Sequence, residues 1–515
     1  MSVRLKAARP ASLGGALLRP PRTRAALLRS VLSGAAALGV ALLAACAPVG
    51  PDYRRPPVEV PPAWTPEPPW RVGLPSDGEL KGDWWTMLGD ETLSDLEQRA
   101  LSGSQSLAVA VARLDQARAQ AAVVSAGLFP TMTLGASAAR ERISANRPLT
   151  DYGRTNSSTL QYEYSVGFAA RWEADVFGRV RRAIEGARAL VGQSAADLEN
   201  ARLILSSELA ADYFSLREVD SEIDVVRQSI ELQRRAMDFV TARHDLGAAS
   251  GLDVAQQKAL LDATSTQIEL LRNQRAKYEH AIAVLVGAPA PGFSLEAALL
   301  TGPPPPPPLG VPSDVLQRRP DVASAERAMA AANAQIGVAQ AAFYPSFVLA
   351  PNIGLDSHTL STLFNAPSLL WAFGVQASQL VFDAHRTQAN VLFAQAAYQG
   401  ALASYRQTVL IALQEVEDGI TALAALERAA GQAQSAVDSS KRLLELANER
   451  YAGGLATYLD VITAQQSLLT NQRQAVQILG QQLLSSVFLV KALGGGYHAG
   501  VADAPGGAGI ALRSH

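Results

Sequence analysis

The sequence has one cysteine in 515 residues, which excludes an intramolecular disulfide. Aromatic residues make up only 6% of the chain, which together with the abundance of alanine favours thin, closely packed helices over a bulky globular core. The net charge is −2 with both signs interspersed, so we expect no nucleic-acid partner. The six histidines are scattered without metal-ligand spacing, so the sequence predicts no metal site, no cofactor and no catalytic centre.

The single cysteine, Cys46, ends a secretory signal. Residues 1–30 carry seven Lys or Arg and no Asp or Glu, and an apolar run over 31–45 follows that is too short to span a bilayer. The ending Leu43-Ala44-Ala45-Cys46 resembles the bacterial lipobox, which implies a signal peptide over 1–45 and a covalent lipid such as palmitate on Cys46. Ala47 implies sorting to the outer membrane. The alternative is a plain signal peptide that happens to contain a cysteine.

A twelve-residue pattern occurs twice in the chain. Its copies are Arg243-His244-Asp245-Leu246-Gly247 with Ser250-Gly251-Leu252-Asp253-Val254, and Arg450-Tyr451-Ala452-Gly453-Gly454 with Thr457-Tyr458-Leu459-Asp460-Val461. Each copy lies between a very long helical pattern and a shorter one. It therefore predicts a helix–turn–helix tip, in which glycine supplies a positive φ and Ser or Thr caps the next helix. The chain is a tandem repeat.

Each repeat begins with a predicted helix, and a proline shortly after the helix marks its end. We expect these helices from about Thr92 to Leu128, before Pro130, and from about Pro312 to Phe343, before Pro345. A strand-like pair follows each proline. One face of 161–173 and one face of 371–377 carry alternating apolar side chains: Tyr162, Tyr164, Val166, Phe168, Ala170 and Trp172; Trp371, Phe373, Val375 and Ala377. This period of two is typical of transmembrane β-strands, although a half-buried strand of a soluble sheet is the alternative.

Very long helices follow both strand pairs. Residues 178–246 carry a sustained heptad repeat that predicts coiled-coil packing, and would span about 100 Å as one helix. The second long helix repeats the pattern, and shorter helices should return over about 253–286 and 460–493. Gly494-Gly495-Gly496 then ends the last helix. Four strands cannot close a barrel in lipid, so several chains must build one jointly: two would give eight strands, three twelve.

The whole mature chain resembles the TolC-like and OprM-like outer-membrane efflux proteins, in their lipoprotein (NodT-type) branch. The resemblance rests on four markers: the doubled tip, Val49-Gly50-Pro51-Asp52-Tyr53-Arg54-Arg55-Pro56, Arg318-Arg319-Pro320-Asp321-Val322 with Ala325-Glu326, and Gln414-Glu415-Val416-Glu417-Asp418. It implies a mainly α fold with a β-barrel portion: two repeats of long coiled-coil helices plus a hairpin, with four strands per protomer completing a twelve-stranded barrel in a trimer.

The expected organisation has six parts. These are a signal peptide (1–45), an acylated Pro-rich segment (46–90), a first repeat (91–300), a Pro-rich linker (301–312), a second repeat (313–494) and a disordered tail (495–515). The resemblance implies a homotrimer in outer-membrane lipid that extends into the periplasm. Its partners would be a periplasmic adaptor (membrane fusion) protein and an inner-membrane pump of RND type.

The resemblance also assigns roles at the tips. It matches Asp460 to a ring aspartate of the family gate and Tyr451 to a tyrosine that helps lock it, with Leu459 as an apolar constriction. Asp253 is the corresponding residue of the first tip. Many relatives carry Asp where this chain has Thr463 and Arg where it has Gln466, so the resemblance does not extend to the second acidic ring and the locking arginine. We expect both tips to dock the adaptor through Gly247, Ser250, Leu252, Gly454 and Thr457.

The sequence therefore favours the exit duct of a tripartite efflux pump that exports small molecules or drugs. Two alternatives stay open at this point. One is a duct for type I protein secretion, which uses the same fold with a different pump. The other is a lipid-anchored coiled-coil scaffold without a channel.

Overall fold

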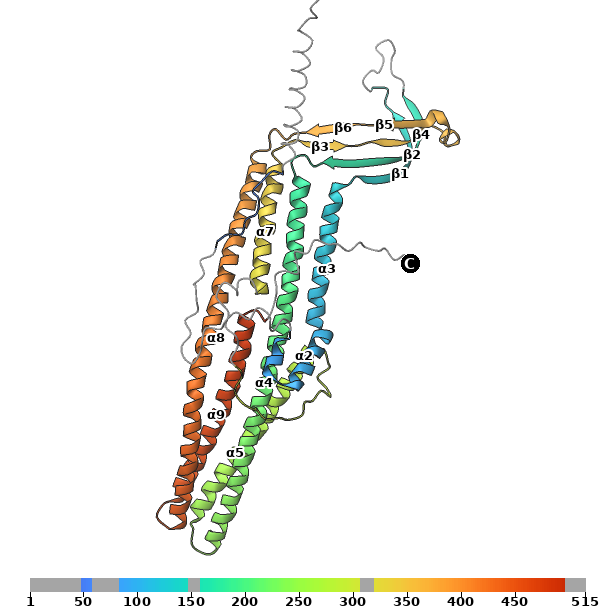
Figure 1. Cartoon of the computed structure of the whole chain (residues 1–515). Coiled ribbons are helices and arrows are strands. Elements are labelled where there is room, and N and C mark those ends of the chain that lie inside the picture. Colours follow the sequence, from blue (N-terminus) through green and yellow to red (C-terminus); the bar gives the residue numbers. More distant parts are fainter. Residues whose placement is uncertain (1–47, 58–82, 147–157, 306–318, 496–515) are drawn as a thin grey trace, which may run out of the picture.

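The computed structural model describes residues 48–57, 83–146, 158–305 and 319–495. The expected signal peptide, Cys46, most of the Pro-rich linker and the tail beyond Gly495 lie outside the described residues. Figure 1 shows one elongated body in which long helices run side by side. A β-sheet lies at one end, and the two tips lie together at the other.

Two helices of equal length form the backbone of the body. They are α4 (Arg179–Asp245) and α8 (Arg386–Ala452), each of 67 residues, and each spans about 100 Å. The returning helices α5 (Gly251–Leu285) and α9 (Tyr458–Ala492) have 35 residues each, close to the predicted bounds. The heptad positions of α4 are buried as predicted, among them Leu209, Leu216 and Val226 at 0% exposure.

The predicted first helix is interrupted. It consists of α2 (Glu91–Gly103), α3 (Gln105–Ser125) and the short η2 (Ala126–Leu128), after η1 (Trp84–Leu88). The expectation of one continuous helix was wrong because Gly103 approaches the loop after α5. A Cβ there would lie 2.6 Å from the carbonyl oxygen of Val286, and Ser104 turns the chain in an extended conformation.

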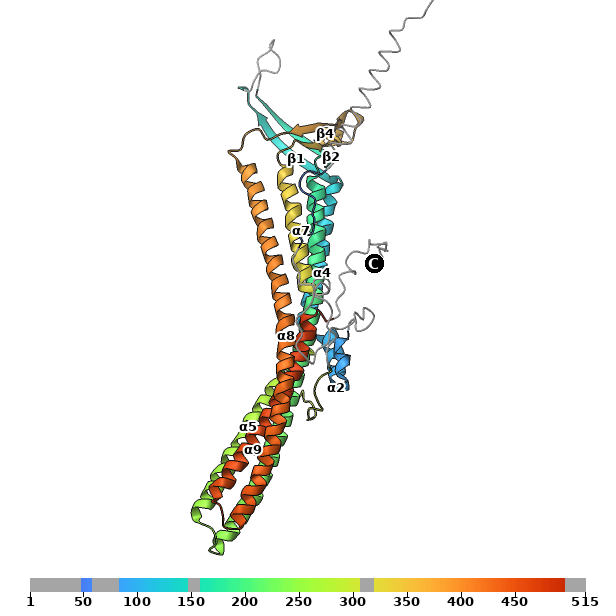
Figure 2. The same ribbon diagram turned by 60° about the vertical axis from the view of Figure 1, so that its left-hand side comes forward.

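The predicted start of the second repeat's helix at about Pro312 lies outside the described residues, and the described helix follows an extended Arg319. It is α7 (Pro320–Ala341), with Pro320 in the first turn, where its missing N–H costs no hydrogen bond. α3, α4, α7 and α8 lie in that order across the half near the sheet, and α5 and α9 continue below α3 and α7 (Figures 1 and 2). Each long helix therefore has two shorter helices stacked end to end beside it.

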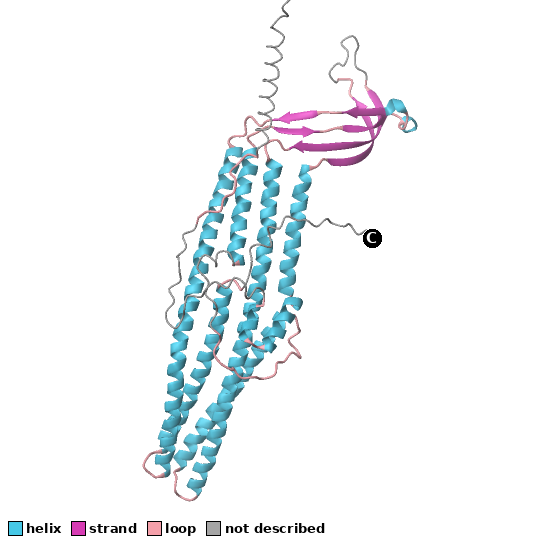
Figure 3. Ribbon diagram, in the orientation of Figure 1, coloured by secondary structure: helices cyan, strands magenta, loops and turns pink. Residues whose placement is uncertain are grey.

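The sheet contains four strand runs, two of which are broken (Figure 3). β1 (Thr131–Ile143) pairs along its whole length with β2 (Thr159–Ala174). The third run consists of β3 (Ser346–Leu349) and β4 (Asn352–Ser357), and the fourth of β5 (Leu369–Ala372) and β6 (Val375–Ser378). Two 3-10 turns, η3 (Leu360–Thr362) and η4 (Ala366–Ser368), connect β4 to β5.

The breaks correct the prediction of one continuous strand over 371–377. Pro351 has no N–H to donate, and Phe373 and Gly374 opposite it are not in a strand. The register nevertheless continues across both breaks. The carbonyl of Pro351 accepts from the Ala170 N–H at 2.8 Å, and the carbonyl of Gly374 accepts from the Ala350 N–H at 3.1 Å. The predicted four-stranded sheet is thus confirmed.

The N-terminal segment 48–57 runs along the helices without secondary structure. The Val49 N–H donates to the carbonyl of Phe177 at 3.0 Å. The guanidinium of Arg182, only 4% exposed, donates to the carbonyls of Val49 and Gly50 and to the carboxylate of Asp52. Residues 48–57 therefore lie along the body, and the marker Val49–Pro56 includes the residues that contact α4.

Among the described helices, α9 is the one long and apolar enough to cross a membrane, judged by length and composition. Many of its apolar side chains, however, are buried against other helices of the same chain. They pack against α4, α5 and α8 in the clusters that contain Tyr458, Val461, Leu469 and Leu483.

Candidate functional site

The two tips share one local construction. Gly247 and Gly454 have φ of +74° and +73°, the left-handed conformation in which glycine avoids a steric clash. Ser250 and Thr457 cap α5 and α9, and the carboxylates of Asp253 and Asp460 accept a hydrogen bond from the backbone N–H of the cap residue. Both capping boxes form between residues three apart, so the sequence pattern alone specified them.

Tyr451 connects the two helical hairpins. Its hydroxyl donates to the Asp253 carboxylate at 3.4 Å, and its ring lies 4.9 Å below the guanidinium of Arg243. The Tyr451 side chain is buried, and this burial together with the nearby Asp253 carboxylate raises the pKa of its hydroxyl. The residue expected to lock the gate therefore joins α8 to the tip of the other hairpin.

Leu459 and its neighbours form an outward stripe on α9. Leu459 is 56% exposed, and Thr463 and Gln466 follow it on the same exposed face. The Thr463 hydroxyl donates to the carbonyl of Leu459 at 2.8 Å. Because threonine is uncharged, this position supplies no charge to a ring. Leu252, the counterpart of Leu459, is 65% exposed. The apolar side chains at both tips are thus free for another surface.

Sequence reasoning missed the deeper contacts between the hairpins. The Tyr458 hydroxyl donates to the side-chain oxygen of Gln257 at 2.8 Å, and the Gln257 amide donates to the carbonyl of Gln233 at 2.9 Å. Gln257 and Gln233 are fully buried. The available signal was Gln233 itself, because it places a polar side chain at a heptad position that is otherwise apolar.

One face of the sheet is apolar and exposed. The row Leu134, Phe168, Ile353 and Trp371 crosses all four strand runs in register, and its members are 51–71% exposed. Soluble monomers rarely leave a contiguous apolar patch of this kind uncovered. Alternating strands with such a face are the pattern of a membrane-spanning sheet.

Both outer strands of the sheet have an unpaired edge within the described residues. β1 pairs only with β2, while β5 and β6 pair only with β4 and β3. Hydrocarbon offers no hydrogen bonds to such edges, so a sheet in lipid must have them covered.

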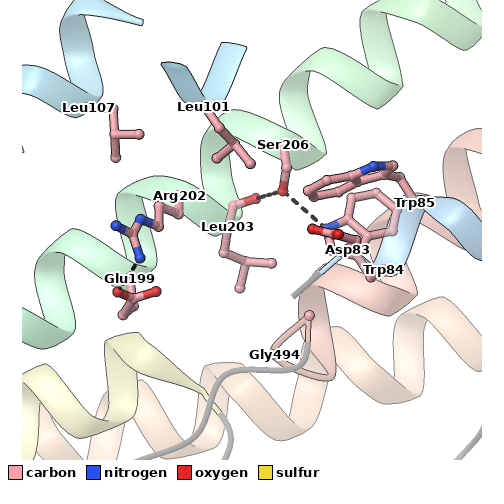
Figure 4. A pocket seen from close by; sticks show the side chains of 11 residues that line it. Asp83, Trp84, Trp85, Leu101, Leu107, Glu199, Arg202, Leu203, Ser206 and Gly494 are labelled. Carbon is pink, nitrogen blue, oxygen red and sulfur yellow. Dashed lines mark hydrogen bonds and ion pairs between the residues drawn. The ribbon is translucent and has the colours of Figure 1, made fainter. Parts of the chain in front are cut away.

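A cavity of about 330 Å³ lies where η1, α2, α3 and α4 meet the end of α9 (Figure 4). The Trp84 indole N–H donates to the Ser206 hydroxyl at 3.0 Å, and Arg202 forms an ion pair with Glu199 at 2.7 Å. These groups are already partnered, so they do not form a reactive set. In the described part of the chain, no group of three or more His, Cys, Asp or Glu is placed to hold a metal ion.

Two of the sequence markers meet in space. The guanidinium of Arg319 binds the carboxylates of Asp321 and Glu415 and the carbonyl of Ala492. Arg319 belongs to the marker at the start of α7, Glu415 belongs to the marker 414–418 on α8, and Ala492 is the last residue of α9. The markers therefore fasten α7 to the α8–α9 hairpin.

Comparison with known proteins gives consistent matches. The sequence matches the family described as outer membrane efflux protein over residues 96–288 and 311–495. It is 30% identical to a probable efflux pump outer membrane protein, SepC of Pseudomonas putida, over 90% of this chain and 96% of that protein. The fold resembles the outer-membrane channel OprN (TM-score 0.80, 29% identity, 87% and 99% covered) and the outer membrane protein VceC of Vibrio cholerae (0.76, 28%, 82% and 100%).

Proposed function

The chain belongs to the outer membrane efflux protein family, and from this premise we propose that three copies assemble into one channel. It is an outer-membrane channel of an efflux pump that extends into the periplasm. The unpaired sheet edges are the observation that carries the proposal of an assembly. Four strand runs from each of three chains would close a twelve-stranded barrel, with β1 of one chain beside β5 and β6 of the next.

The exposed helices support the same arrangement. α3 and α8 are the outer helices of the layer (Figure 1), and both carry exposed apolar side chains, including Val123, Phe393 and Leu410. Association around a threefold axis would bring α3 of one copy against α8 of the next and continue the barrel as a helical tunnel. In this proposal residues 91–300 and 313–494 each supply one hairpin of helices and half of the strands.

The gate would lie where the tips meet. Three chains bring six tips together, so Leu459 and Asp460 of α9 form rings, and Tyr451 bonded to Asp253 holds the two hairpins of each chain closed. Thr463 and Gln466 add no charge to the pore. The exposed leucines and the turns at Gly247, Ser250, Leu252, Gly454 and Thr457 would dock a periplasmic adaptor, which connects the channel to an inner-membrane pump of RND type. The cargo would be small molecules, and the chain itself carries out no catalytic step.

The assembly is tested by electrophoresis and by conductance. We expect the purified protein to migrate as a trimer in mild detergent, to convert to monomer on heating, and to conduct ions in a planar bilayer. Closed barrels resist detergent because every strand is paired. A lipid-anchored scaffold would give neither a heat-modifiable trimer nor conductance, and that outcome would reject the channel.

Cys46 supplies a separate test of the lipid anchor. We expect metabolic labelling with a fatty acid to mark the wild-type protein and to leave Cys46→Ser unlabelled, since the variant has no thiol to acylate. The trimer and its conductance should survive, because the sheet does not depend on the lipid. Equal labelling of both proteins would show that Cys46 is not the acylated residue.

A further inference from the structure

The two helical hairpins also meet well above the tips, where α4 crosses α9. Glu222 of α4 is 4% exposed, and both of its carboxylate oxygens are bound from α9. Arg473 donates to one oxygen at 2.7 and 2.9 Å, and the Gln477 amide donates to the other at 2.8 Å. A third bond from Arg473 reaches the side-chain oxygen of Gln267 on α5 at 3.3 Å.

Glu218, one helical turn before Glu222, has no such partner. In the described part of the chain no hydrogen bond or ion pair reaches its carboxylate, which is half-buried against Gly480 of α9. A Cβ at Gly480 would lie 2.0 Å from the nearer carboxylate oxygen of Glu218, so the lack of a side chain at Gly480 makes this close approach possible. Two carboxylates therefore face α9, and Arg473 of α9 is already bound to Glu222.

We propose that Glu218 and Glu222 of α4, with Arg473 and Gly480 of α9, form a proton-sensitive clasp that positions one hairpin against the other. Neutral Glu218 packs against Gly480 without leaving a charge unpaired. Ionised Glu218 repels Glu222 and favours water, which loosens the crossing. This inference rests on the proposed gate, because the hairpins that the clasp holds are those whose tips would open.

Glu222 is the charged group that acts on the Glu218 carboxylate. Two cations of the neighbouring helices are already paired: Arg473 of α9 with Glu222, and Arg275 of α5 with Asp220 and Glu279. Burial, and then the Glu222 charge, raise the pKa of Glu218 to about 7. Because a loosened Glu218 would ionise near the ordinary glutamate pKa, the clasp should weaken between about pH 4.5 and 7 and change little outside that range.

Amide hydrogen exchange of the purified channel tests the clasp directly. After correction for the intrinsic rate, we expect exchange in 473–480 to be about tenfold slower at pH 5 than at pH 8. Glu218→Gln, which carries no charge, should exchange slowly at both pH values. Glu231→Gln is the matched control, since Glu231 lies on the same helix but is exposed and paired with Arg234. It should behave as the wild type does.

Conductance of the same proteins separates the two proposals. We expect wild-type openings to become rarer at pH 5 and those of Glu218→Gln to be rare at both pH values. A wild-type protein that never conducts would reject the channel, while the exchange experiment would still report on the clasp. An unchanged pH dependence in Glu218→Gln would overturn the clasp even if the channel conducts. Asp212, whose pKa burial raises to about 6, would then be the next group to replace.

Discussion

Replacing Leu459 by Ser and Asp460 by Ala in one protein should make single-channel openings at least about tenfold more frequent. A tenfold change needs about 1.4 kcal/mol. Losing the bond that the Asp460 carboxylate accepts from the Thr457 N–H at the start of α9 costs about 1 kcal/mol in each of three chains. The double variant also removes the exposed apolar side chain of Leu459 and the charge beside it. Recordings in a planar bilayer at fixed salt and pH would measure the effect.

Two further variants identify which property closes the pore. Asp460→Asn keeps an oxygen that can cap α9 but removes the charge, so it separates the charge from the cap. Tyr451→Phe keeps the ring beneath Arg243 but removes the hydroxyl that reaches Asp253, so it tests the lock alone and should have a smaller effect. Large openings that are the same in the wild type and in every variant would place the gate elsewhere.

Glu97 gives the largest expected effect on stability. Its side chain on α2 is fully buried, and both carboxylate oxygens lack a hydrogen-bond partner. Burial, with a smaller contribution from Asp83, raises its pKa to about 9. The unfolded chain ionises near the ordinary glutamate value, so stability should be highest below about pH 4.5. It should then fall by about 1.4 kcal/mol per pH unit up to about pH 9, a loss of about 3 kcal/mol at pH 7.

Glu97→Gln should abolish this pH dependence, because the amide stays neutral in both states. Glu97→Leu should also stabilise the protein at neutral pH, since it removes the unpaired polar atoms from a cluster that includes Leu93, Leu96 and Ala100. Melting curves followed by tryptophan fluorescence at pH 5 and pH 8 would measure the effect, with Glu91→Gln on the exposed start of α2 as the control. A pH dependence that persists in Glu97→Gln would show that another group causes it.

Features that depend on near neighbours in the chain could be predicted from the sequence alone. The capping boxes at Ser250 and Thr457 join residues three apart, so the doubled pattern was enough to place both tips. Heptad spacing gave the long helices, because one stripe of a helix repeats with that period. The alternation of apolar and polar residues predicted the apolar, exposed face of the sheet, because successive side chains of a strand point to opposite faces.

Features that depend on residues far apart in the chain became visible only in the folded structure. The bond between Tyr451 and Asp253 joins residues 198 apart, and the one between Arg319 and Glu415 joins residues 96 apart, so no local pattern could pair them. The break at Gly103 exists because α2 meets the loop at Val286, and Glu97 is buried because of how α2 packs. Glu218 likewise faces α9 only because the two hairpins cross there. The spacing of residues predicts caps, turns and the faces of helices and strands, whereas burial and charge pairing depend on which helices come together.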